Sequence, residues 1–569
     1  MKINEIFKNE NFTVNDYLTY CGIDDINKYF HPIWEIDNWN NYNNINESVE
    51  MFNKHFLSFN PVYIICDSDL DGITSTSILY SYMIDLAIDC KEDWDIQILL
   101  HNSKERGLQD NEILTHIKEN PRPFIIIPDA GTNDKKQVQY LKKQFNTDIL
   151  VLDHHDIETP IEDGILITNQ KNNKISPNGS GCLVTYMFLK ALDEYYKRNN
   201  ADYYIDLVAL SLISDSMDMS DQQNRTFYHY GLEQTDNIKN IFLYKTFEKF
   251  VGDFEYTQRD IAFKIVPKFN SVIRSDDTKL KQQIIECFIG CEDNFNEVLE
   301  KCAECHRNQI KLVDKIITNH KTEIEKANKN NIVLLSCDDM PRSYSGLVAG
   351  KIMNICNKPT IVGKIKDDEF IGSLRSPVPF RTELNECKLI KWAIGHENSC
   401  GVSFFSNNYN NLIDYYNTLK ISYEPHIDVL KSYDINNIPD NIFSLFGANL
   451  DVLWGYGIPK PTFEIYNILY YPQDIMILGA NKRTLKIISN GVNFLFFNIT
   501  KQQKADLGLG YIVDGEFYDN IKSEKLCLSC IGNLSVNRYK SYVNNQMIVD
   551  NFKVTEYKPK TIKSVFKRR

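Results

Sequence analysis

The chain has 569 residues, of which 43% are apolar and 24% are charged, so a collagen-like, coiled-coil or wholly disordered protein is excluded. This length predicts roughly three or four domains. The 63 Lys and Arg against 76 Asp and Glu give a net charge of −13, which argues against a protein that coats nucleic acid through uniform positive charge. That charge remains compatible with a nucleic-acid enzyme whose acids gather in a metal site.

The apolar pattern and the cysteine content indicate the compartment. No stretch reaches about 18 consecutive apolar residues, so we expect no membrane span and no membrane partner. The N-terminal sequence is polar rather than an apolar signal core, which predicts a chain that is not secreted. The 14 cysteines are too few for a disulfide scaffold and are typical of small buried side chains in a reducing compartment. We therefore expect a cytoplasmic protein.

The first predicted elements form a βαβ pattern between residues 61 and 215. Short apolar runs predict buried parallel strands at 62–66, 124–128 and 149–152. Amphipathic stretches predict helices at 73–90, 110–119 and 133–145. This alternation is typical of a doubly wound α/β sheet.

Acidic residues follow each of these three predicted strands. The acids are Asp67, Asp69 and Asp71 after the first strand, Asp129 after the second, and Asp153 after the third, where His154 and His155 follow; Asp215 ends a further apolar stretch at 205–214. A single Asp after a strand is more often a helix cap. Three such clusters at the carboxyl ends of parallel strands instead predict one shared crevice.

Carboxylates that share a crevice repel one another unless cations compensate their charge. Oxygen-rich sites with one or two imidazoles suit Mn²⁺ or Mg²⁺ better than Zn²⁺. Two such cations can clamp a phosphoester and activate a water. The acids therefore predict a two-cation site that acts on phosphoester bonds.

The later elements predict further lobes. Residues 230–330 are mainly helical and charged. A strand at 332–336, a helix at 346–356 and strands at 360–364 and 369–374 predict a second, smaller α/β lobe that ends near residue 430. From about residue 438 the chain is rich in short strands separated by glycine turns, which predicts a small β-barrel.

Four segments in the first lobe resemble the motifs of the DHH phosphoesterases in order and spacing. They are Asp67–Ser75, Pro128–Gly131, Asp153–His155 and Leu207–Asp215. In the second lobe, Gly372–Ser376 and Gly395–Gly401 resemble the two substrate motifs of the DHH-associated domain. The second of these departs from the usual pattern at Ile394, Ser399 and Cys400.

Other segments resemble the RecJ-type single-strand exonucleases within this superfamily. Pro267–Asn270 with Arg274 is similar to their segment before the second lobe, and Trp454–Pro461 is similar to the turn that enters their OB-fold. The resemblance covers roughly residues 55 to 555. It implies an α/β fold with a doubly wound, mainly parallel DHH domain, a smaller α/β DHH-associated domain and a C-terminal OB-fold β-barrel. It also suggests a phage or prophage origin.

The resemblance also implies domain boundaries. We expect an N-terminal extension at 1–50, a DHH catalytic domain at 51–230, a helical connector at 231–330, a DHH-associated substrate-binding domain at 331–432, an OB-fold at 433–555 and a basic tail at 556–569. The first fifty residues carry no interpretable pattern.

Roles follow from the resemblance residue by residue. The implied ligands of two divalent cations, Mn²⁺ first and Mg²⁺ as the alternative, are Asp69, Asp71, Asp129, His154 and Asp215. The implied catalytic residues are His155, Asp129 and Asp67, while Asp153 and Asp67 would orient ligands or imidazoles. The residues implied to hold phosphate or DNA are Ser373, Arg375, Ser376, Gly395, His396, Asn270 and Arg274.

The activity implied by the resemblance is hydrolysis of single-stranded DNA from 5′ to 3′, with release of 5′-mononucleotides, in repair, recombination or replication. The implied partners are single-stranded DNA and either a helicase or a single-strand-binding protein, in a bacterial or phage-infected cell. Two alternatives stay open. One is a DHH phosphodiesterase for short oligonucleotides or cyclic dinucleotides, which needs no C-terminal barrel. The other is a replication scaffold without catalysis.

The C-terminal segment offers candidates for base stacking and phosphate contact. The aromatic candidates are Phe494, Phe496, Phe497, Tyr539 and Tyr542, with Arg538 and Lys540 nearby. We expect about half of the phenylalanines to be core, because their alternation places one face inside. Residues 551–569 carry seven Lys or Arg against one Glu. This predicts a basic track and an affinity for single strands that falls as salt rises.

Overall fold

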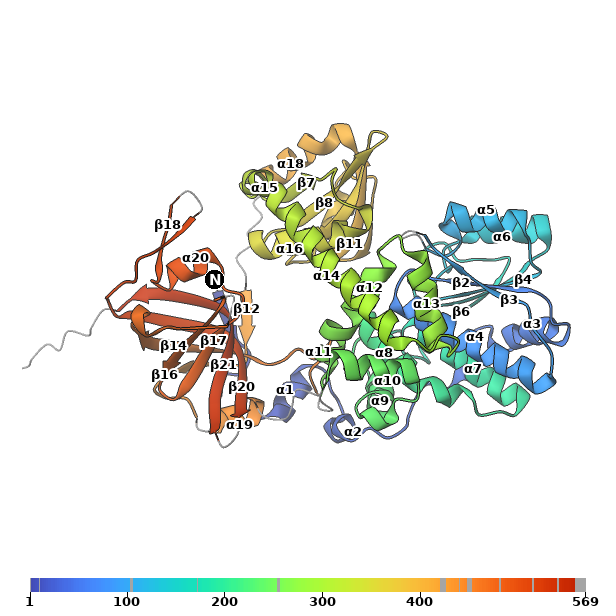
Figure 1. Ribbon diagram of the computed structural model, residues 1–569, viewed down its shortest axis with the longest axis horizontal. Coiled ribbons are helices and arrows are strands. Elements are labelled where there is room, and N and C mark those ends of the chain that lie inside the picture. The colour runs from blue at the N-terminus through green and yellow to red at the C-terminus, as the bar shows by residue number, and fades with distance from the viewer. Residues whose placement is uncertain are drawn as a thin grey trace, which may run out of the picture. The chain divides into compact units, whose positions relative to one another are not determined.

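The computed structural model describes residues 2–9, 11–102, 106–170, 172–252, 256–419, 426–439, 441–447, 453–479, 482–513, 516–539 and 542–557. The chain divides into two compact units (Figure 1). The central unit is His31–Tyr423, and the terminal unit combines Met1–Phe30 with Glu424–Arg569. No helix in the described part of the chain is both long and apolar enough to cross a membrane.

A five-stranded parallel sheet forms the first layer of the central unit, in the order β3-β2-β4-β5-β6. The strands are β2 (Val62–Cys66), β3 (Ile96–Leu100), β4 (Phe124–Pro128), β5 (Asp148–Asp153) and β6 (Ile165–Thr168). The predicted parallel α/β architecture is confirmed. The two edge strands β3 and β6 were not predicted.

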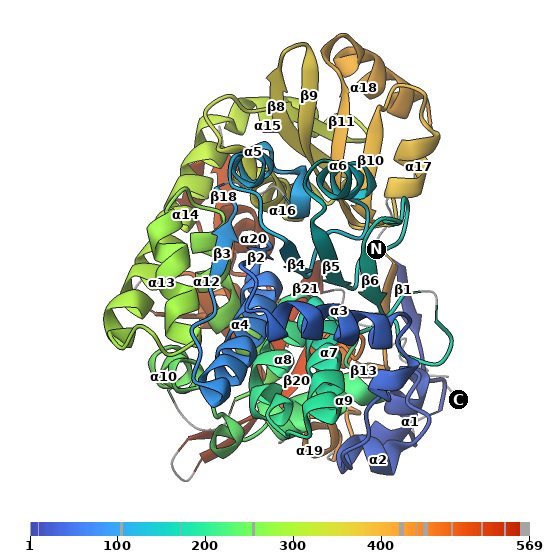
Figure 2. The ribbon, with the colours of Figure 1, turned by 90° about the vertical axis from the view of Figure 1, so that its right-hand side faces the viewer.

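Helices cover both faces of this sheet, as Figure 2 shows. On one face lie α3 (Ile45–Leu57), α4 (Leu70–Cys90) and α7 (Gly181–Tyr196), and on the other lie α5 (Asn111–Glu119) and α6 (Lys135–Phe145). Alternate strand residues feed the two cores: Ile64 and Ile126 pack with the first group, and Ile65 and Ile127 with the second. Covered on both faces, β2 and β4 are apolar along their whole length, β5 is apolar between its two terminal aspartates, and all three strands are buried.

A run of helices follows the sheet and leads to the second lobe. It comprises α8 (Ile205–Ser214), α9 (Gln222–Gly231), α10 (Ile241–Phe250), α11 (Gln258–Asp260), the π-helical turn η5 (Ile261–Ile265), α12 (Val266–Ile273), α13 (Thr278–Phe288), α14 (Phe295–Asn319) and α15 (Lys321–Ala327). The apolar stretch before Asp215 is therefore a helix, α8.

The second lobe of the central unit is a five-stranded mixed sheet in the order β10-β11-β9-β8-β7. Only β7 and β8 pair in parallel. Its elements are β7 (Val333–Ser336), α16 (Ser345–Cys356), β8 (Thr360–Lys366), β9 (Glu369–Arg375), α17 (Arg381–Glu386), β10 (Trp392–His396), β11 (Ser399–Phe405) and α18 (Tyr409–Thr418). The predicted smaller α/β lobe matches these elements.

The terminal unit contains a seven-stranded sheet in the order β13-β14-β20-β21-β17-β16-β15. The strands are β13 (Ser432–Asp434), β14 (Thr462–Tyr470), β15 (Met476–Leu478), β16 (Thr484–Ser489), β17 (Val492–Phe496), β20 (Leu526–Tyr539) and β21 (Tyr542–Glu556). Among the described residues β13 and β15 are the two edges and do not pair with each other, so the predicted closed OB-fold barrel is not confirmed. Sequence alternation fixes which face of a strand is buried, but it does not determine whether the outer strands meet.

The phenylalanines in and after β17 divide as expected between core and surface. Phe494 and Phe496 are buried and Phe497 is 53% exposed. Tyr539 and Tyr542 lie on β20 and β21, but their side chains, with Arg538, lie outside the described set, as do Lys540 and the tail beyond residue 557.

The N-terminal residues form part of the terminal unit. β1 (Lys2–Glu5) pairs in parallel with β12 (His426–Val429), and α1 (Val14–Tyr20) and α2 (Ile26–Phe30) follow it. The Phe12 ring packs against Phe446 and Phe463, with centroids 5.5 and 6.4 Å away. Residues 2–30 thus contribute to the hydrophobic core of a sheet whose strands lie more than 400 positions later in the chain.

Candidate metal centre

The acidic residues meet at the carboxyl edge of the parallel sheet. Asp67 follows β2, Asp129 follows β4, and Asp153 is the last residue of β5. Asp69 caps the N-terminus of α4, where its side chain accepts a hydrogen bond from the Gly72 N–H at 3.0 Å. Asp129 has a φ of +65°, a left-handed conformation that Asp tolerates better than most residues.

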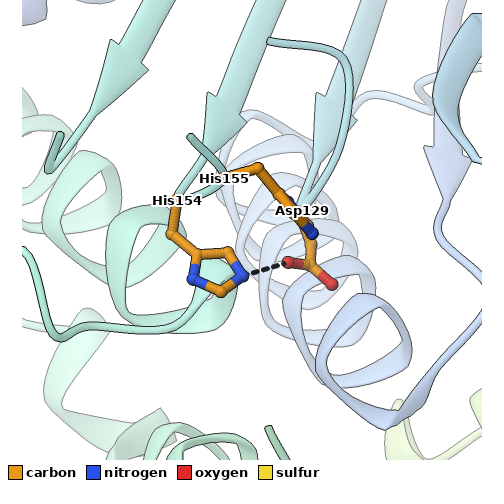
Figure 3. Close-up of side chains that lie close together, drawn as sticks. All are labelled: Asp129, His154 and His155. Atoms are coloured by element: carbon orange, nitrogen blue, oxygen red, sulfur yellow. Dashed lines mark ion pairs between the residues drawn. The ribbon is translucent and has the colours of Figure 1, made fainter. Parts of the chain in front are cut away.

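Three overlapping groups of side chains place metal-ligating atoms within 4.8 Å of one another. They are Asp67, Asp69 and Asp129; Asp71, His154 and Asp215; and Asp129, His154 and His155. His154 lies near the middle of the cluster, and its Nε2 is 3.3 Å from Asp129 Oδ1 (Figure 3). The same nitrogen is 3.5 Å from Asp215 Oδ2 and 3.8 Å from Asp71 Oδ2. These groups contain seven of the eight acids and histidines predicted to ligate or assist a cation pair, all except Asp153.

The carboxylates of Asp67 and Asp129 indicate that this cluster fits a cation. Both side chains are about 99% buried, and none of their four oxygens accepts a hydrogen bond from the described residues. A buried carboxylate without a hydrogen-bond donor is costly, and such groups are usually paired or coordinate a metal. Carboxylate and imidazole donors form the ligand set that Mn²⁺ and Mg²⁺ accept.

Asp71 differs from these two acids because the protein supplies donors to it. Its oxygens accept the N–H groups of Gly181 and Cys182, each at 2.8 Å, and the Ser211 hydroxyl at 2.6 Å. Gly181 is the first residue of α7, so the positive end of that helix faces the acid. These bonds hold Asp71 in place beside His154.

Asp153 organises the two histidines. Its Oδ1 accepts the backbone N–H groups of His154 and His155 and faces the His155 Nδ1 at 2.8 Å. Its Oδ2 accepts the Thr132 N–H at 3.0 Å from the loop after β4. One carboxylate thus connects the loops after β4 and β5 and contacts the His155 imidazole.

The charges in the cluster perturb one another. Burial, together with Asp71 and Asp69, raises the pKa of Asp129 well above its usual value. Burial raises the pKa of Asp67 to about 7, although Arg106 opposes the shift. Burial would lower the pKa of His155, but Asp153 raises it to about 9. Without compensating cations, several negative charges are disfavoured here, as expected for a site built around bound cations.

Arg106 contacts this cluster and was not predicted. Its Nη1 contacts the His155 Nε2, and its Nε lies 3.8 Å from Asp67 Oδ2. It stands in the loop after β3, held by Asp134, which accepts the Leu108 N–H at 2.7 Å. A single arginine in a loop carries no sequence signal. Its place beside the cluster depends on strand β3, which was not predicted.

A cavity of about 180 Å³ opens beside the cluster. Its lining residues are Ser68, Asp69, Leu70, Arg106, Ser214, Asp215, Asn270, Ile273 and Arg274. The Asn270 Oδ1 is buried there without a hydrogen-bond partner among the described residues. Asn270 and Arg274, predicted to contact DNA, therefore share a polar cavity with two of the predicted metal ligands.

The second-lobe candidates lie at the ends of β9 and β10. Arg375 ends β9, and a Cβ built on Gly346, near the start of α16, would lie 2.7 Å from its Nη2. Burial, together with the positive charge of Arg375, lowers the pKa of Arg274. The Arg274 carbonyl accepts a hydrogen bond at 2.9 Å from the hydroxyl of Ser343, which lies just before α16. Ser373 Oγ lies 2.8 Å from Ser345 Oγ. Ser376 accepts the Val378 N–H at 3.2 Å.

The remaining candidates are Gly395 and His396, which lie in β10 and do not line the cavity. Gly395, with a φ of +132°, precedes His396 at the exposed end of β10. His396 and Arg375 both lie opposite Ser399 of β11, one on each side of it, so they belong to one row across the sheet. The lining of the cavity does not include His396, Gly395, Ser373, Arg375 or Ser376.

Comparison with known proteins identifies the first lobe. Residues 61–212 match the model of the DHH family, N-terminal domain. The chain is 26% identical over 567 residues to the putative SPbeta prophage-derived single-strand DNA-specific exonuclease YorK of Bacillus subtilis (strain 168), covering 91% of this chain and 92% of that protein. It is 22% identical over 517 residues to the single-stranded-DNA-specific exonuclease RecJ of the same organism, covering 87% of this chain and 62% of RecJ.

A solved structure shares the fold. The crystal structure of RecJ in complex with Mn²⁺ from Thermus thermophilus superposes with a TM-score of 0.73 at 16% identity, covering 95% of this chain and 76% of that one. The resemblance predicted from the motifs is confirmed: residues 61–212 form a DHH domain, and the chain is a homologue of the YorK and RecJ proteins.

Proposed function

We propose that this chain is a metal-dependent exonuclease that hydrolyses phosphodiester bonds of single-stranded DNA. The observation that carries the proposal is the pair of buried carboxylates, Asp67 and Asp129, whose four oxygens have no hydrogen-bond donor among the described residues. The names of the homologous YorK and RecJ proteins supply the substrate class.

The proposed cation ligands are Asp69, Asp71, Asp129, His154 and Asp215, with Mn²⁺ as the first choice of cation and Mg²⁺ as the second. Divalent cations in such a site polarise the phosphate and activate a water. Asp67 lies within reach of Asp69 and Asp129 and would accept a hydrogen bond from a ligand or water. Asp153 keeps the His155 imidazole oriented for phosphate contact or proton transfer.

Arginines on the two lobes would hold the substrate phosphates. Arg106 lies beside Asp67 and His155, Arg274 lines the cavity, and Arg375 ends β9 in the second lobe. A guanidinium matches the geometry of a phosphate with two parallel donors. We assign the chemistry to residues 51–230 and the phosphate contacts to residues 331–432, with Ser373, Ser376, Gly395, His396 and Asn270 as additional contacts.

The finer features of the proposal rest on the motif resemblance. They are 5′-to-3′ polarity, release of 5′-mononucleotides, a role in DNA repair, recombination or replication, cooperation with a helicase or a single-strand-binding protein, and action in the cytoplasm of a bacterial or phage-infected cell. We also assign single-strand binding to the C-terminal sheet, in the manner of an OB-fold.

The proposal is tested with the purified chain on single strands labelled at the 5′ or the 3′ end. We expect release of mononucleotides from the 5′ end with Mn²⁺, weaker release with Mg²⁺ and none with a chelator. A labelled duplex of the same sequence should resist cleavage. Products that start from the 3′ end would refute the polarity.

A phosphodiesterase for short substrates shares the metal centre, so dinucleotide hydrolysis provides the discriminating comparison. We expect a higher kcat/KM on a long single strand than on a dinucleotide or a cyclic dinucleotide. The opposite order would support the short-substrate alternative. Cleavage that persists in both Asp129→Ala and Asp69→Ala would exclude the proposed metal centre.

A further inference from the structure

One face of the helical segment formed by α11, η5 and α12 carries a continuous row of side chains that are not buried. Arg259 and Phe263 are exposed, and Pro267, Asn270 and Arg274 are partly exposed. We refer to these five residues as the helix row. Successive members are four, four, three and four residues apart, so each lies next to the previous one on the helix surface. The opposite face packs into the core through Ile261, Ile265, Val266, Phe269, Val272 and Ile273.

One end of the helix row lies in the cavity beside the metal centre. Asn270 and Arg274 line this cavity together with Asp69 and Asp215, two of the proposed metal ligands. The Asn270 Oδ1 is buried there without a hydrogen-bond partner among the described residues. Buried polar atoms of this kind are normally paired, and a donor on a bound molecule, such as the amino group of a base, would satisfy this oxygen.

The other end of the helix row is an exposed aromatic side chain. Phe263 is 69% exposed, and the guanidinium carbon of Arg259 lies 5.5 Å from its ring centroid. Proteins that bind single strands without sequence preference stack bases on such rings, with added cation–π attraction from arginine. Phe263 and Arg274 are 11 residues apart, which corresponds to about 16 Å along a helix. A dinucleotide held in the cavity does not span this distance, whereas a longer strand does.

Positive charge accompanies the helix row. Residues 256–274 contain four Lys or Arg and a single acid, Asp260. The Asp260 Oδ1 is paired with the Lys264 Nζ at 2.7 Å. On the adjoining helix α10, the acid Glu248 is paired with Lys245 at 2.6 Å. The segment therefore carries an excess of positive charge, which suits a phosphate backbone.

We propose that the helix row binds the part of a single strand that extends from the metal cavity, with a base stacked on Phe263 and a phosphate held by Arg259. The inference rests on the proposed function and deepens it, because it names residues that act only on strands long enough to leave the cavity. Side chains four positions apart also stabilise a helix by themselves. That role requires neither an exposed ring nor the continuation of the same face into the cavity.

The test compares a long single strand with a dinucleotide. For Phe263→Ala we expect kcat/KM on oligo(dT) to fall roughly fivefold to one-hundredfold, the range for loss of one stacked base, while kcat/KM on the dinucleotide stays unchanged. Binding of fluorescein-labelled oligo(dT) in EDTA, measured by fluorescence anisotropy, should weaken by a similar factor. Phe263→Trp keeps a stacking ring and should behave as the wild type does. Arg259→Gln should reduce the slope of log affinity against log salt by about 0.7.

Phe405→Ala is the matched control, because Phe405 is 55% exposed and the Lys391 Nζ lies 5.7 Å from its ring centroid. It should change neither binding nor cleavage. Circular dichroism should show that Phe263→Ala retains its fold. Folded Phe263→Ala protein with an affinity for oligo(dT) within twofold of the wild type would overturn the inference, as would an equal loss of kcat/KM on the dinucleotide. If the wild type cleaves no DNA but its binding of oligo(dT) still depends on Phe263, only the proposed nuclease function fails.

Discussion

At the scale of single residues, the candidate metal centre combines a strained backbone with crowded negative charge. Asp129 has a left-handed backbone, its carboxylate is buried, and other acids surround it. A non-glycine residue in this conformation typically costs about 1–3 kcal/mol, and such residues cluster at functional sites. The surrounding sheet and α7 hold this acid where burial and the neighbouring carboxylates disfavour its negative charge.

Replacing Asp129 by Asn preserves its shape and removes its charge. We expect cleavage to fall roughly 10²-fold or more, comparable with the loss of a major electrostatic contact in an active site. In EDTA the variant should melt at a higher temperature than the wild type, because repulsion among buried acids is relieved. Mn²⁺ should raise the Tm of the wild type and have little effect on the variant. Equal Mn²⁺-induced shifts in both proteins would contradict the assignment of Asp129 as a ligand.

Asp153 is predicted to act through its neighbours rather than by direct contact with the substrate. Asp153→Asn loses a charged acceptor for the His155 Nδ1 and the backbone N–H groups of the loop. Changes of this kind typically reduce metal affinity or activity about 10- to 100-fold. The measurement is kcat/KM together with the Mn²⁺ concentration for half-maximal activity. Asp156→Asn, at an exposed position three residues on, is the matched control and should behave as the wild type.

The acidic residues of the candidate site were predictable from the sequence, whereas its basic residues were less so. Asp67, Asp129 and Asp153 follow apolar strands, so their convergence was predictable from the parallel topology. Arg106 stands alone in a loop, and only the folded chain shows that it contacts His155. The row that joins Arg375 and His396 depends on the register of β9, β10 and β11, which no local pattern specifies.

At the scale of secondary structure, the start of α7 positions the metal centre. Gly181 approaches Asp129 so closely that an added Cβ would lie 2.3 Å from its Oδ1. The Gly181 N–H also donates to Asp71. The first turn of α7 thus packs against one proposed ligand and supports another.

Gly181→Ala should therefore displace α7 from Asp129 or rotate the carboxylate. We expect weaker Mn²⁺ binding, measured by calorimetric titration, and a loss of cleavage of roughly tenfold or more, in the range seen for altered supporting contacts. Gly350→Ala in α16 is the control, because its added Cβ meets only Arg375 Cγ at 3.8 Å. Unchanged Mn²⁺ affinity in Gly181→Ala would show that the close approach of residue 181 to Asp129 is not needed for Mn²⁺ binding.

The opposite edge of the parallel sheet is stabilised by Asp148 at the start of β5. It accepts bonds from Lys142 and Lys54, at 2.5 and 2.6 Å, and faces His55 Nε2 at 3.0 Å. Burial would raise the pKa of Asp148, but Lys142, Lys54 and His55 lower it well below its usual value. Its ionised form is therefore favoured in the folded state.

Asp148→Asn should lower the free energy of unfolding by about 1.5–3 kcal/mol at pH 7, the range for hydrogen bonds to charged groups. A depressed pKa contributes stability above the unfolded value near 3.9, and this contribution is lost as pH falls toward the folded pKa. The difference between wild type and variant should thus narrow below about pH 4. Urea unfolding at several pH values measures the free energy of unfolding of both proteins. A difference between them that stays constant down to pH 3 would contradict a lowered pKa of Asp148 in the folded state.

Helices and buried strands were predictable because their periodicity is strong over several residues. The edge strands β3 and β6 were not, since β3 is only partly buried and mixes a polar residue into its apolar run. The barrel was predicted from alternation and turns, and the observed strands do alternate. Whether such a sheet closes depends on the pairing of its outermost strands, which is a property of the whole unit.

At the scale of the whole molecule, the two units depend on different parts of the chain. The terminal unit needs residues 2–30 for its core, where Phe12 is 4% exposed and Tyr17 donates to the Pro459 carbonyl at 2.8 Å. The central unit has its own cores. A core substitution in residues 2–30 should therefore destabilise the whole terminal unit.

Phe12→Ala should destabilise the terminal unit by about 3–5 kcal/mol, as for other large-to-small core changes. Hydrogen–deuterium exchange should accelerate in peptides from β14 and β20 and stay unchanged in peptides from β2, β4 and β5. The exposed residue Tyr20, 57% accessible, offers the control Tyr20→Ala. Uniform acceleration across both units would show that they unfold together.

The pairing of β1 with β12 has a consequence for biosynthesis. Asn4 of β1 bonds to Asp428 of β12, 424 positions later. At about 5–20 residues per second, β1 leaves the ribosome roughly 20–85 s before its partner strand is made. All residues of the central unit are synthesised within that interval, so this unit has time to fold first. Meanwhile Phe12 remains without Phe446 and Phe463, its ring partners in the folded unit.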